Sequence, residues 1–298
     1  MVRISKKTID GKDYYYLGHT IRKGKKIEKK ELYLGREIPQ NIEQTKRKFI
    51  ESIYKEKWFD LCDKIKENYL RDKKSTPHSA KEKEMSQFIT HFTYNTNKIE
   101  GSTLTFRETA QLLERGIMPK ERPLADVREA ETHKSVFLEM IGYNKDISLQ
   151  IILYWHKKLF EQTKKDIAGR IRTHQVAISG SKFMPPFPAE LNILLREFFQ
   201  EYHKNQDKIH PVELSALVHL KFVTIHPFSD GNGRISRILM NFILNKYQYP
   251  LLDIPYEKRT GYYNALERSQ LKKENTIFVQ WFLRRYLKEH QKYLRNKN

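Results

Sequence analysis

Two helix-forming stretches joined by one short polar loop constrain this chain more than any other feature. Apolar residues recur at helical spacing from Pro211, which suits a first helical turn, to Ile225. Pro227 cannot continue that helix, because it lacks a backbone N–H and clashes with the preceding turn. A second apolar stripe begins near Gly233 and consists of Ile235, Ile238, Leu239, Phe242 and Ile243. The pattern predicts a helix–loop–helix unit around the sequence HPFSDGNGRISR, residues 226–237.

The residues of this loop have the chemistry of an anion site. The tight turn Gly231-Asn232-Gly233 precedes a helix N-terminus, where free backbone N–H groups and the helix dipole attract anions. Arg234 and Arg237 are three residues apart, so both guanidiniums can reach one polyphosphate. Asp230 is an oxygen ligand suited to Mg²⁺, and a neutral His226 can accept a proton from an attacking hydroxyl. Each feature alone is more often structural, but their combination in twelve residues predicts a catalytic phosphate site.

The sequence HPFSDGNGRISR resembles the Fic (Fido) signature H-x-F-x-[DE]-G-N-G-R-x-x-R, with every specified position filled. The resemblance implies an all-α, Fic-type helical domain with a small β-hairpin flap. It also implies a protein adenylyltransferase that moves AMP from ATP to a Tyr, Ser or Thr hydroxyl of a protein. His226 is then the catalytic base, and Asp230 the Mg²⁺ ligand. The ATP-binding residues implied by the signature are Asp230, Gly231, Asn232, Gly233, Arg234, Ile235, Ser236 and Arg237.

A second short motif lies well before the signature. Thr96 and Glu100, followed by Gly101, resemble the inhibitory motif [ST]-x-x-x-[EN]-G of the same family, in its class II position. The resemblance implies an inhibitory helix at about 78–100, whose Glu100 pairs with Arg237 where the ATP γ-phosphate would bind. The alternative is that Glu100 only ends a helix in water.

Two further stretches are assigned by resemblance. Val176 and Ile178 alternate with small or polar residues before Gly180 and Pro185-Pro186, which predicts a short hairpin. It is similar to the family's flap, which docks the target by strand addition, although it could be only a surface hairpin. The implied flap residues are Val176, Ala177, Ile178, Ser179 and Gly180. Tyr262, Tyr263 and Gln270 fall where the family contacts adenosine, but family members often carry Asn at the Gln270 position, and the tyrosines equally suit helix packing.

The N-terminal part of the chain has a different pattern. Residues 13–36 are typical of two strands around a Lys23-Gly24 turn. This hairpin either contacts nucleic acid or a protein target through its basic and aromatic residues, or covers the apolar end of the next helix. A long helix is predicted from Pro39 to about Leu70, followed by a polar linker at 71–80. The predicted domains are a hairpin at 1–38, a linking helix at 39–75, and a Fic domain at 76–298 with its Fido core at about 148–284.

Several other helices are predicted from periodicity and caps. One starts near Pro77, and a capping box of Thr105 and Glu108 begins another that ends at Gly116. Helices at about 123–143 and 148–162 follow, the second capped by Ser148. His156 lies in an apolar pattern and is interpreted as a packing histidine. A final helix contains Ile277, Val279, Trp281, Phe282 and Tyr286.

The charge, the hydropathy and the cysteine count narrow the kinds of protein that this chain can be. The 298 residues include 56 Lys and Arg against 36 Asp and Glu, a net charge of +20 that attracts polyanions. Nucleic-acid contact through the basic hairpin is therefore possible, although no base-reading element is specified. The sequence has no apolar run near eighteen residues and no signal-peptide pattern, so no membrane association is expected. The single cysteine, Cys62, excludes an internal disulfide and a cysteine zinc cluster, and a cytoplasmic location is the expectation.

The sequence therefore favours an adenylyltransferase that is autoinhibited by Glu100 and uses ATP with Mg²⁺. Its expected partner is a protein with an exposed hydroxyl residue, or the chain itself, and similar proteins suggest a homo-oligomer. Two alternatives remain: a de-AMPylase or a transferase with another phosphate donor on the same scaffold, and a nucleic-acid-binding regulator.

Overall fold

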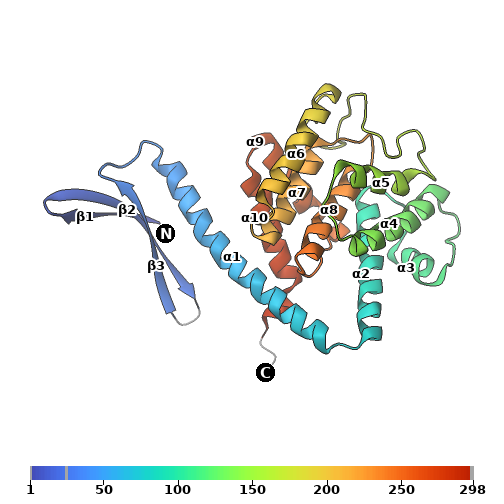
Figure 1. Cartoon of the computed structure of the whole chain (residues 1–298), viewed down its shortest axis with the longest axis horizontal. Helices are drawn as coiled ribbons and strands as arrows, with labels where there is room; N and C mark the ends of the chain where they lie inside the picture. Colours follow the sequence, from blue (N-terminus) through green and yellow to red (C-terminus); the bar gives the residue numbers. More distant parts are fainter. Residues whose placement is uncertain (1, 24–25, 296–298) are drawn as a thin grey trace. The chain divides into compact units, whose positions relative to one another are not determined.

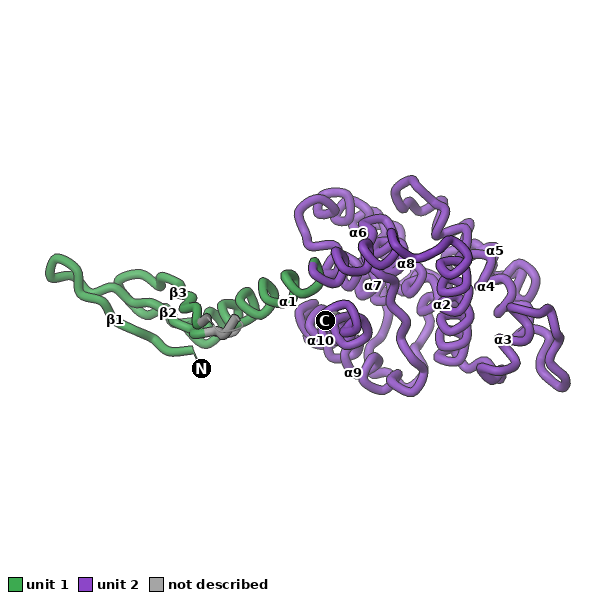
Figure 2. Tube along the Cα trace, turned by 90° about the horizontal axis from the view of Figure 1, so that it is seen from below, with its two compact units in different colours: residues 1–63 green, residues 64–298 purple. Residues whose placement is uncertain are grey.

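A computed structural model of the chain describes residues 2–23 and 26–295. The chain forms two compact units, residues 1–63 and 64–298, which are coloured separately in Figure 2. The division falls inside the long helix α1 (Ile42–Ser75), whereas the sequence suggested boundaries at 38 and 75, which stay predictions. The predicted fold class is confirmed, because the larger unit is helical and strands occur, among the described residues, only near the N-terminus.

The first unit is a three-stranded antiparallel sheet followed by the first part of α1. Its strands, in the order β1-β2-β3, are β1 (Arg3–Ile9), β2 (Lys12–Lys23) and β3 (Lys26–Gly35). Leu17 is fully buried and packs against Phe49 and Ile53 of α1, so the sheet does cover an apolar helix face. The prediction of two strands was correct for β2 and β3 but missed β1. Gly24, in the predicted turn, lies outside the described residues.

The second unit contains the end of α1 and nine further α-helices among its described residues (Figure 1). They are α2 (His78–Ile99), α3 (Phe106–Arg115), α4 (Leu124–Gly142), α5 (Leu149–Phe160), α6 (Leu191–Asn205), α7 (Pro211–Ile225), α8 (Asn232–Lys246), α9 (Arg259–Lys272) and α10 (Asn275–Glu289). Three short 3₁₀ helices lie at η1 (Pro188–Glu190), η2 (Tyr256–Lys258) and η3 (Gln291–Leu294). The helix α6 was not predicted.

Local capping chemistry sets several helix ends as expected. Thr105 accepts a hydrogen bond from the Glu108 N–H, and the Glu108 carboxylate accepts one from the Thr105 N–H, which completes the predicted capping box. The Ser148 side chain accepts from the Ile151 N–H at the start of α5. The predicted linker at 71–80 was wrong in part, because α1 continues to Ser75. Pro77 explains the break, since a proline disfavours helical geometry in the residue before it.

The helices α7 and α8 form the centre of the second unit. They pack against each other, and α8 also contacts α2, α4 and α5 (Figure 1). Ile235, Ile238 and Leu239 of α8 are fully buried, as the apolar stripe predicted. Polar side chains of α8 are buried as well, including both arginines of the signature. A helix that is buried on all sides keeps such groups only when they have partners, and those partners make up the site.

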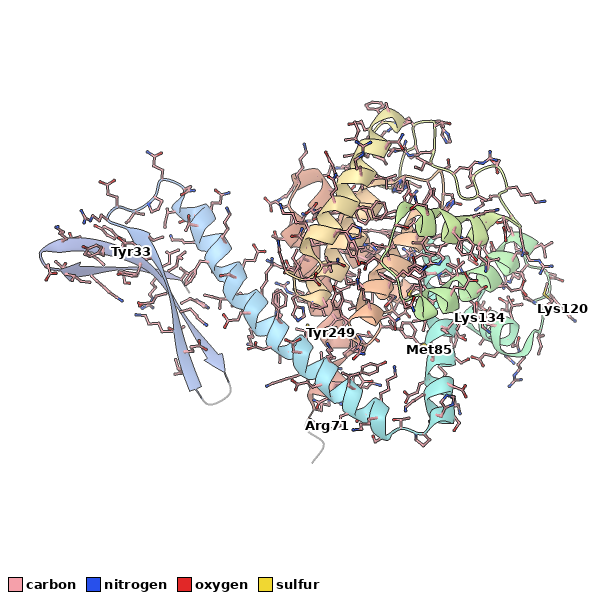
Figure 3. All side chains as sticks on the ribbon, viewed as in Figure 1. Tyr33, Arg71, Met85, Lys120, Lys134 and Tyr249 are labelled. Carbon is pink, nitrogen blue, oxygen red and sulfur yellow. The ribbon has the colours of Figure 1, made fainter. Side chains whose placement is uncertain are left out.

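The end of α1 is tied to the C-terminal part of the second unit. Asn68 donates to the Tyr293 carbonyl at 2.7 Å, and the rings of Tyr69 and Tyr293 lie 5.6 Å apart. The Lys66 ammonium lies 4.9 Å from the ring centre of Tyr249, which is labelled in Figure 3. Residues 64–75 therefore belong to the packed body of the second unit.

The predicted flap hairpin was wrong in its secondary structure. Residues 176–178 have no regular secondary structure and residues 179–180 form a turn, in which Gly180 has a φ of 74°, so none of them joins a β-ladder. The return arm begins with Pro185-Pro186, and proline has no N–H to donate to a ladder. Side chains hold the two arms together instead: Gln175 donates to the Pro185 carbonyl at 2.9 Å. Glu267 of α9 anchors the turn by accepting from the Ser181 hydroxyl at 3.0 Å.

No helix in the described ranges 2–23 and 26–295 combines the length and apolar character that crossing a membrane requires.

Candidate active site

His226 ends α7 in a left-handed conformation, with a φ of 53°. Its Nδ1 lies 3.1 Å from the Val223 carbonyl oxygen, which can only accept, so Nδ1 carries the proton in the neutral ring. Burial lowers the pKa of His226, although the hydrogen bond to Val223 opposes this shift. The imidazole is therefore neutral near pH 7 with an unprotonated Nε2, which is the form that a general base requires.

Arg172, which the sequence did not single out, holds His226 in place. Its side chain is buried, and its Nε donates to the His226 carbonyl at 2.8 Å. The same guanidinium donates to the His174 carbonyl at 2.9 Å and to the Pro186 carbonyl at 2.6 Å. One side chain thus joins the loop of the signature to both arms of the flap segment.

The turn of the signature is closed by its own asparagine. The Asn232 Oδ1 accepts from the Phe228 N–H at 2.9 Å, and its Nδ2 donates to the Phe228 carbonyl at 2.8 Å. Gly231 has a φ of 80°, and a Cβ at this position would collide with the Phe160 ring. The Asn232 side chain is thereby committed to the loop, so its contribution to an anion site would come from its backbone N–H.

His156 was predicted to be a packing histidine, and it is fully buried. It also positions the loop. Its Nδ1 accepts from the Gly169 N–H at 2.9 Å, so Nε2 carries the proton and donates to the Asp230 carbonyl at 3.0 Å. The ring stacks on Phe228 at 3.7 Å, and burial lowers its pKa to about 4. A neutral His156 therefore fixes the backbone of Asp230.

The carboxylate of Asp230 belongs to a cluster of four charged side chains. Its Oδ2 lies 2.6 Å from Lys164 Nζ, and its Oδ1 lies 3.2 Å from Arg234 Nη2. Glu129 of α4 completes the cluster with an ion pair to Arg234 and a 3.1 Å contact to Lys164 Nζ. Burial would raise the pKa of Asp230, but Arg234 and Lys164 outweigh it and hold that pKa at about 2. Asp230 is therefore ionised throughout the neutral range.

Arg237 is buried at the centre of the second motif. Its Nη2 forms an ion pair with Glu100 Oε1 at 2.5 Å and also donates to the Thr96 carbonyl at 3.2 Å, and its Nε donates to the Thr96 hydroxyl. Burial alone would lower the pKa of Arg237, but Glu100 and Tyr262 outweigh it and raise that pKa. The two motifs thus meet at one guanidinium, although 125 residues lie between Glu100 and His226 in the sequence.

The Glu100 carboxylate lies directly over the first turn of α8. A Cβ added to Gly233 would collide with Glu100 Oε1, so a larger residue there would displace the carboxylate. The backbone N–H groups of a first helical turn attract anions. Glu100 therefore occupies the position at which an anionic ligand of α8 would bind.

The three predicted adenosine contacts, Tyr262, Tyr263 and Gln270, lie on α9 and form hydrogen bonds to neighbouring helices. The Tyr262 hydroxyl lies 3.4 Å from Arg237 Nη1 and 3.0 Å from His219 Nε2, and burial raises the pKa of Tyr262 to about 12. The Tyr263 hydroxyl donates to the Ile99 carbonyl at 3.0 Å, at the end of α2. Gln270 donates to the Thr224 hydroxyl at 3.2 Å.

The other two signature residues that were predicted to bind ATP, Ile235 and Ser236, contribute to packing and to hydrogen bonding within α8. Ile235 is fully buried in the core, and the Ser236 hydroxyl donates to the Gly233 carbonyl at 2.8 Å. The structure thus brings together a neutral imidazole, a helix N-terminus, two buried arginines and an ionised aspartate. This combination can accept a proton from a hydroxyl and balance the charge of a polyphosphate, with Glu100 in competition for the anion position.

Comparisons with known proteins agree with this geometry. Residues 146–244 match the family model described as the Fic/DOC family. A relative named "Protein adenylyltransferase Fic" from Aedes aegypti is 32% identical over 217 residues, covering 71% of this chain and 43% of that protein. The relative of the same name from Drosophila melanogaster is 34% identical over 184 residues, covering 58% of this chain and 36% of that protein. This chain therefore spans less than half the length of the curated relatives that it matches.

Solved structures show the same similarity. A signaling protein with a Fic domain from Bacteroides thetaiotaomicron has a TM-score of 0.68 and 26% identity, covering 78% of this chain and 95% of that one. Fic-1 (residues 134–508) from C. elegans has a TM-score of 0.73 and 25% identity, covering 86% of this chain and 78% of that one. The agreement of sequence, site geometry and fold leads to one conclusion: this chain belongs to the Fic/DOC family.

Proposed function

We propose that this chain is a protein adenylyltransferase that transfers AMP from ATP to a hydroxyl group of a protein. The observation that carries the proposal is the position and tautomer of His226, with Nδ1–H bonded to Val223 and Nε2 left to accept a proton. The names of the relatives from Aedes aegypti and Drosophila melanogaster support the same reaction.

In the proposed reaction, His226 Nε2 takes the proton of the target hydroxyl while its oxygen attacks the α-phosphorus of ATP. The bond from the α-phosphorus to the bridging oxygen breaks, and pyrophosphate leaves. The backbone N–H groups at the start of α8 and the guanidiniums of Arg234 and Arg237 balance the phosphate charge. Arg172 keeps the loop of His226 in register with the flap segment, which we propose as the docking site for the target.

Mg²⁺ fits Asp230 as a shared ligand. The Asp230 carboxylate is ionised, and Mg²⁺ typically combines one or two carboxylates with substrate phosphates. Within the described part of the chain, no three His, Cys, Asp or Glu residues cluster as a metal cage. When bound, the ion would neutralise charge on the phosphates. Lys164 occupies the same carboxylate and would have to share or leave it.

We further propose that Glu100 inhibits the enzyme in the described conformation. Its carboxylate pairs with Arg237 and covers the first turn of α8, where the γ-phosphate of ATP would lie. Two anions cannot occupy this position together, so ATP binds productively only when Glu100 moves. A difference of about 3 kcal/mol between the two arrangements would change activity on the order of a hundredfold.

Mass spectrometry of a matched pair of variants tests the proposal. Glu100→Gly should gain an adenylyl group when incubated with ATP and Mg²⁺, or should add one to an acceptor protein in a cell extract. The double variant Glu100→Gly, His226→Ala keeps the open anion site but lacks the base, and it should show no gain. Equal labelling of the double variant would remove His226 from the mechanism.

Two other chemistries on this scaffold are separated by the same samples. If another nucleotide displaces ATP and labels Glu100→Gly better, the phosphate donor is different. If the wild-type protein removes AMP from the labelled acceptor, Glu100 serves hydrolysis rather than inhibition alone.

A second candidate function is binding of single-stranded nucleic acid by the N-terminal sheet. The rings of Tyr14 and Tyr16 lie 6.2 and 5.2 Å from that of Tyr33, which is labelled in Figure 3, and Lys7 Nζ lies 4.4 Å from the ring centre of Tyr16. Such a basic and aromatic face suits unpaired bases. Binding of an oligonucleotide that weakens steeply with salt, and that Tyr33→Ala weakens further, would support it.

Self-association of the chain also stays a prediction, and sedimentation velocity, which measures the molecular mass in solution, tests it.

A further inference from the structure

We propose that the groove between α9 and α10 is a second ligand site, built to bind a nucleotide away from the signature loop. The groove has a volume of about 520 Å³, within the range of small-molecule sites. Its walls combine basic side chains, one indole ring and two amides. Neither the family signature nor the inhibitory motif includes these residues.

The charge of the groove selects an anion. Arg268 of α9 and Arg284, Arg285 and Lys288 of α10 line it, and no carboxylate does so among the described residues. Glu289 pairs with Arg285, yet the buried Arg285 Nε has no hydrogen-bond acceptor in the described ranges. Guanidiniums present donors that match phosphate oxygens in pairs. A ligand with two or more phosphate charges satisfies this wall better than a single carboxylate.

The rest of the groove selects an aromatic group beside the phosphates. Trp281 lines the groove, and two other aromatic rings hold its indole in place. Its ring lies 5.5 Å from that of Phe278 at an angle of 26° and 5.6 Å from that of Tyr262. A fixed indole offers a stacking surface for a base, and the amides of Asn264 and Gln280 can read its polar edge. The groove therefore offers partners for the phosphates and for the base of a nucleotide.

This groove is distinct from the proposed ATP site. Arg268 and Gln270 are two residues apart on α9, so they point to nearly opposite sides of the helix. Gln270 faces α7 through its bond to Thr224, whereas Arg268 lines the groove. Tyr262 lies between the two sites: its ring contacts Trp281 of the groove, and its hydroxyl contacts Arg237 of the proposed ATP site.

Titration of the full chain with ADP, followed by tryptophan fluorescence, tests the inference without any AMP transfer. ADP should change the fluorescence saturably, and Trp281→Phe should remove that change. Arg268→Glu combined with Lys288→Glu should weaken ADP binding at least tenfold. The matched control is Arg196→Glu combined with Lys204→Glu, which makes the same charge change on exposed positions of α6 and should stay within twofold of wild type.

Three outcomes would overturn the inference. Equal ADP affinity of the two charge-reversed variants would show that the groove does not bind the nucleotide. Equal binding of ADP and inorganic pyrophosphate would remove the role of Trp281. Tighter binding of an oligoglutamate peptide or an oligothymidylate than of ADP, with the same loss on charge reversal, would assign the groove to a macromolecule. Because AMP transfer is not measured, failure of the proposed enzymatic function would leave this result unaffected.

Discussion

At the scale of single residues, Lys164 occupies the carboxylate that we propose as the Mg²⁺ ligand. Its ammonium lies 2.6 Å from Asp230 Oδ2 and 3.1 Å from Glu129 Oε1, so a cation already neutralises the proposed Mg²⁺ ligand. A lysine at this point lets the half-buried carboxylate stay ionised without a metal. The same contact puts Lys164 in competition with any divalent ion that approaches Asp230.

Lys164→Met is therefore expected to raise the affinity for a divalent ion. Removing the ammonium leaves the Asp230 carboxylate with Arg234 as its remaining charged partner, and the loss of competition should tighten Mn²⁺ binding by about tenfold, equivalent to about 1.4 kcal/mol. Electron paramagnetic resonance of free Mn²⁺, with ADP present, measures this affinity directly.

Lys158→Met provides the control, because Lys158 pairs with Glu139 rather than with Asp230. The control should bind Mn²⁺ like the wild-type protein. If Lys164→Met and Lys158→Met give the same Mn²⁺ affinity, Lys164 does not compete with the metal.

The sequence predicted the residues of the site that lie within a short motif, but it missed their distant partners. His226, Asp230 and Arg237 were found because the signature is contiguous. Glu129 and Lys164 lie 105 and 66 positions from their partners, with no spacing that links them to the loop. Arg172 acts on backbone carbonyls, which every sequence has, so its residue type alone gives no signal.

At the scale of elements, α2 ends with the C-cap Glu100, the residue that we propose as the inhibitor, and Asn95 fixes the helix near that end. The Asn95 Nδ2 donates to Asp253 Oδ2 at 2.5 Å, and its Oδ1 accepts from the Tyr256 N–H at 3.0 Å. Burial raises the pKa of Asp253 to about 7, while Asn95 opposes the shift; Glu289 raises this pKa further and Arg285 lowers it. The attachment of α2 to the segment after α8 therefore depends on a carboxyl group that titrates near neutrality.

The folded pKa of Asp253, about 7, lies above its unfolded value of 3.8, so the folded state holds the proton longer. Stability from this proton is complete below about pH 4 and is lost as the pH rises through 7. Asp253→Asn should remove that loss. We expect it to be more stable than the wild-type protein at pH 8 by about 2 kcal/mol and to have a flatter stability profile between pH 4 and 7.

Chemical denaturation at pH 5 and pH 8, followed by circular dichroism, measures this difference. Asp146→Asn is a useful comparison, because the pKa of Asp146 is lowered and its titration should leave the profile above pH 5 unchanged. An Asp253→Asn profile parallel to that of the wild-type protein would show that this carboxyl group does not titrate as expected.

Elements were predicted well where a local cap or an apolar stripe defines them. The capping box of α3 and the apolar stripe of α8 are examples. The strand β1 was missed because six of its seven side chains are exposed and show no alternation, although Asp10-Gly11 was an available turn signal. Their φ values of 49° and 70° suit a tight hairpin turn. The prediction of flap strands was wrong although the sequence alternates there. Alternation is a local pattern, and a β-ladder also needs a partner strand, which the described structure lacks at this segment.

At the scale of the whole molecule, each compact unit has its own core. Leu17 is fully buried in the first unit, and Leu239 is fully buried in the second. Leu17 packs with Phe49 and Ile53, which all precede residue 64, so its contacts stay within the first unit. The signature loop and the Glu100–Arg237 pair lie wholly in the second unit.

Leu17→Ala and Leu239→Ala form a matched pair that tests whether the units unfold independently. Each removes the same buried group and should cost about 2–4 kcal/mol of the stability of its own unit. Hydrogen exchange read by mass spectrometry should show faster exchange before residue 64 in Leu17→Ala and after it in Leu239→Ala. Since α1 runs through the division, its residues near 63 should respond to both. If Leu17→Ala accelerates exchange in α7 and α8 as strongly as in β2, the chain unfolds as one cooperative body, and the site depends on the N-terminal sheet.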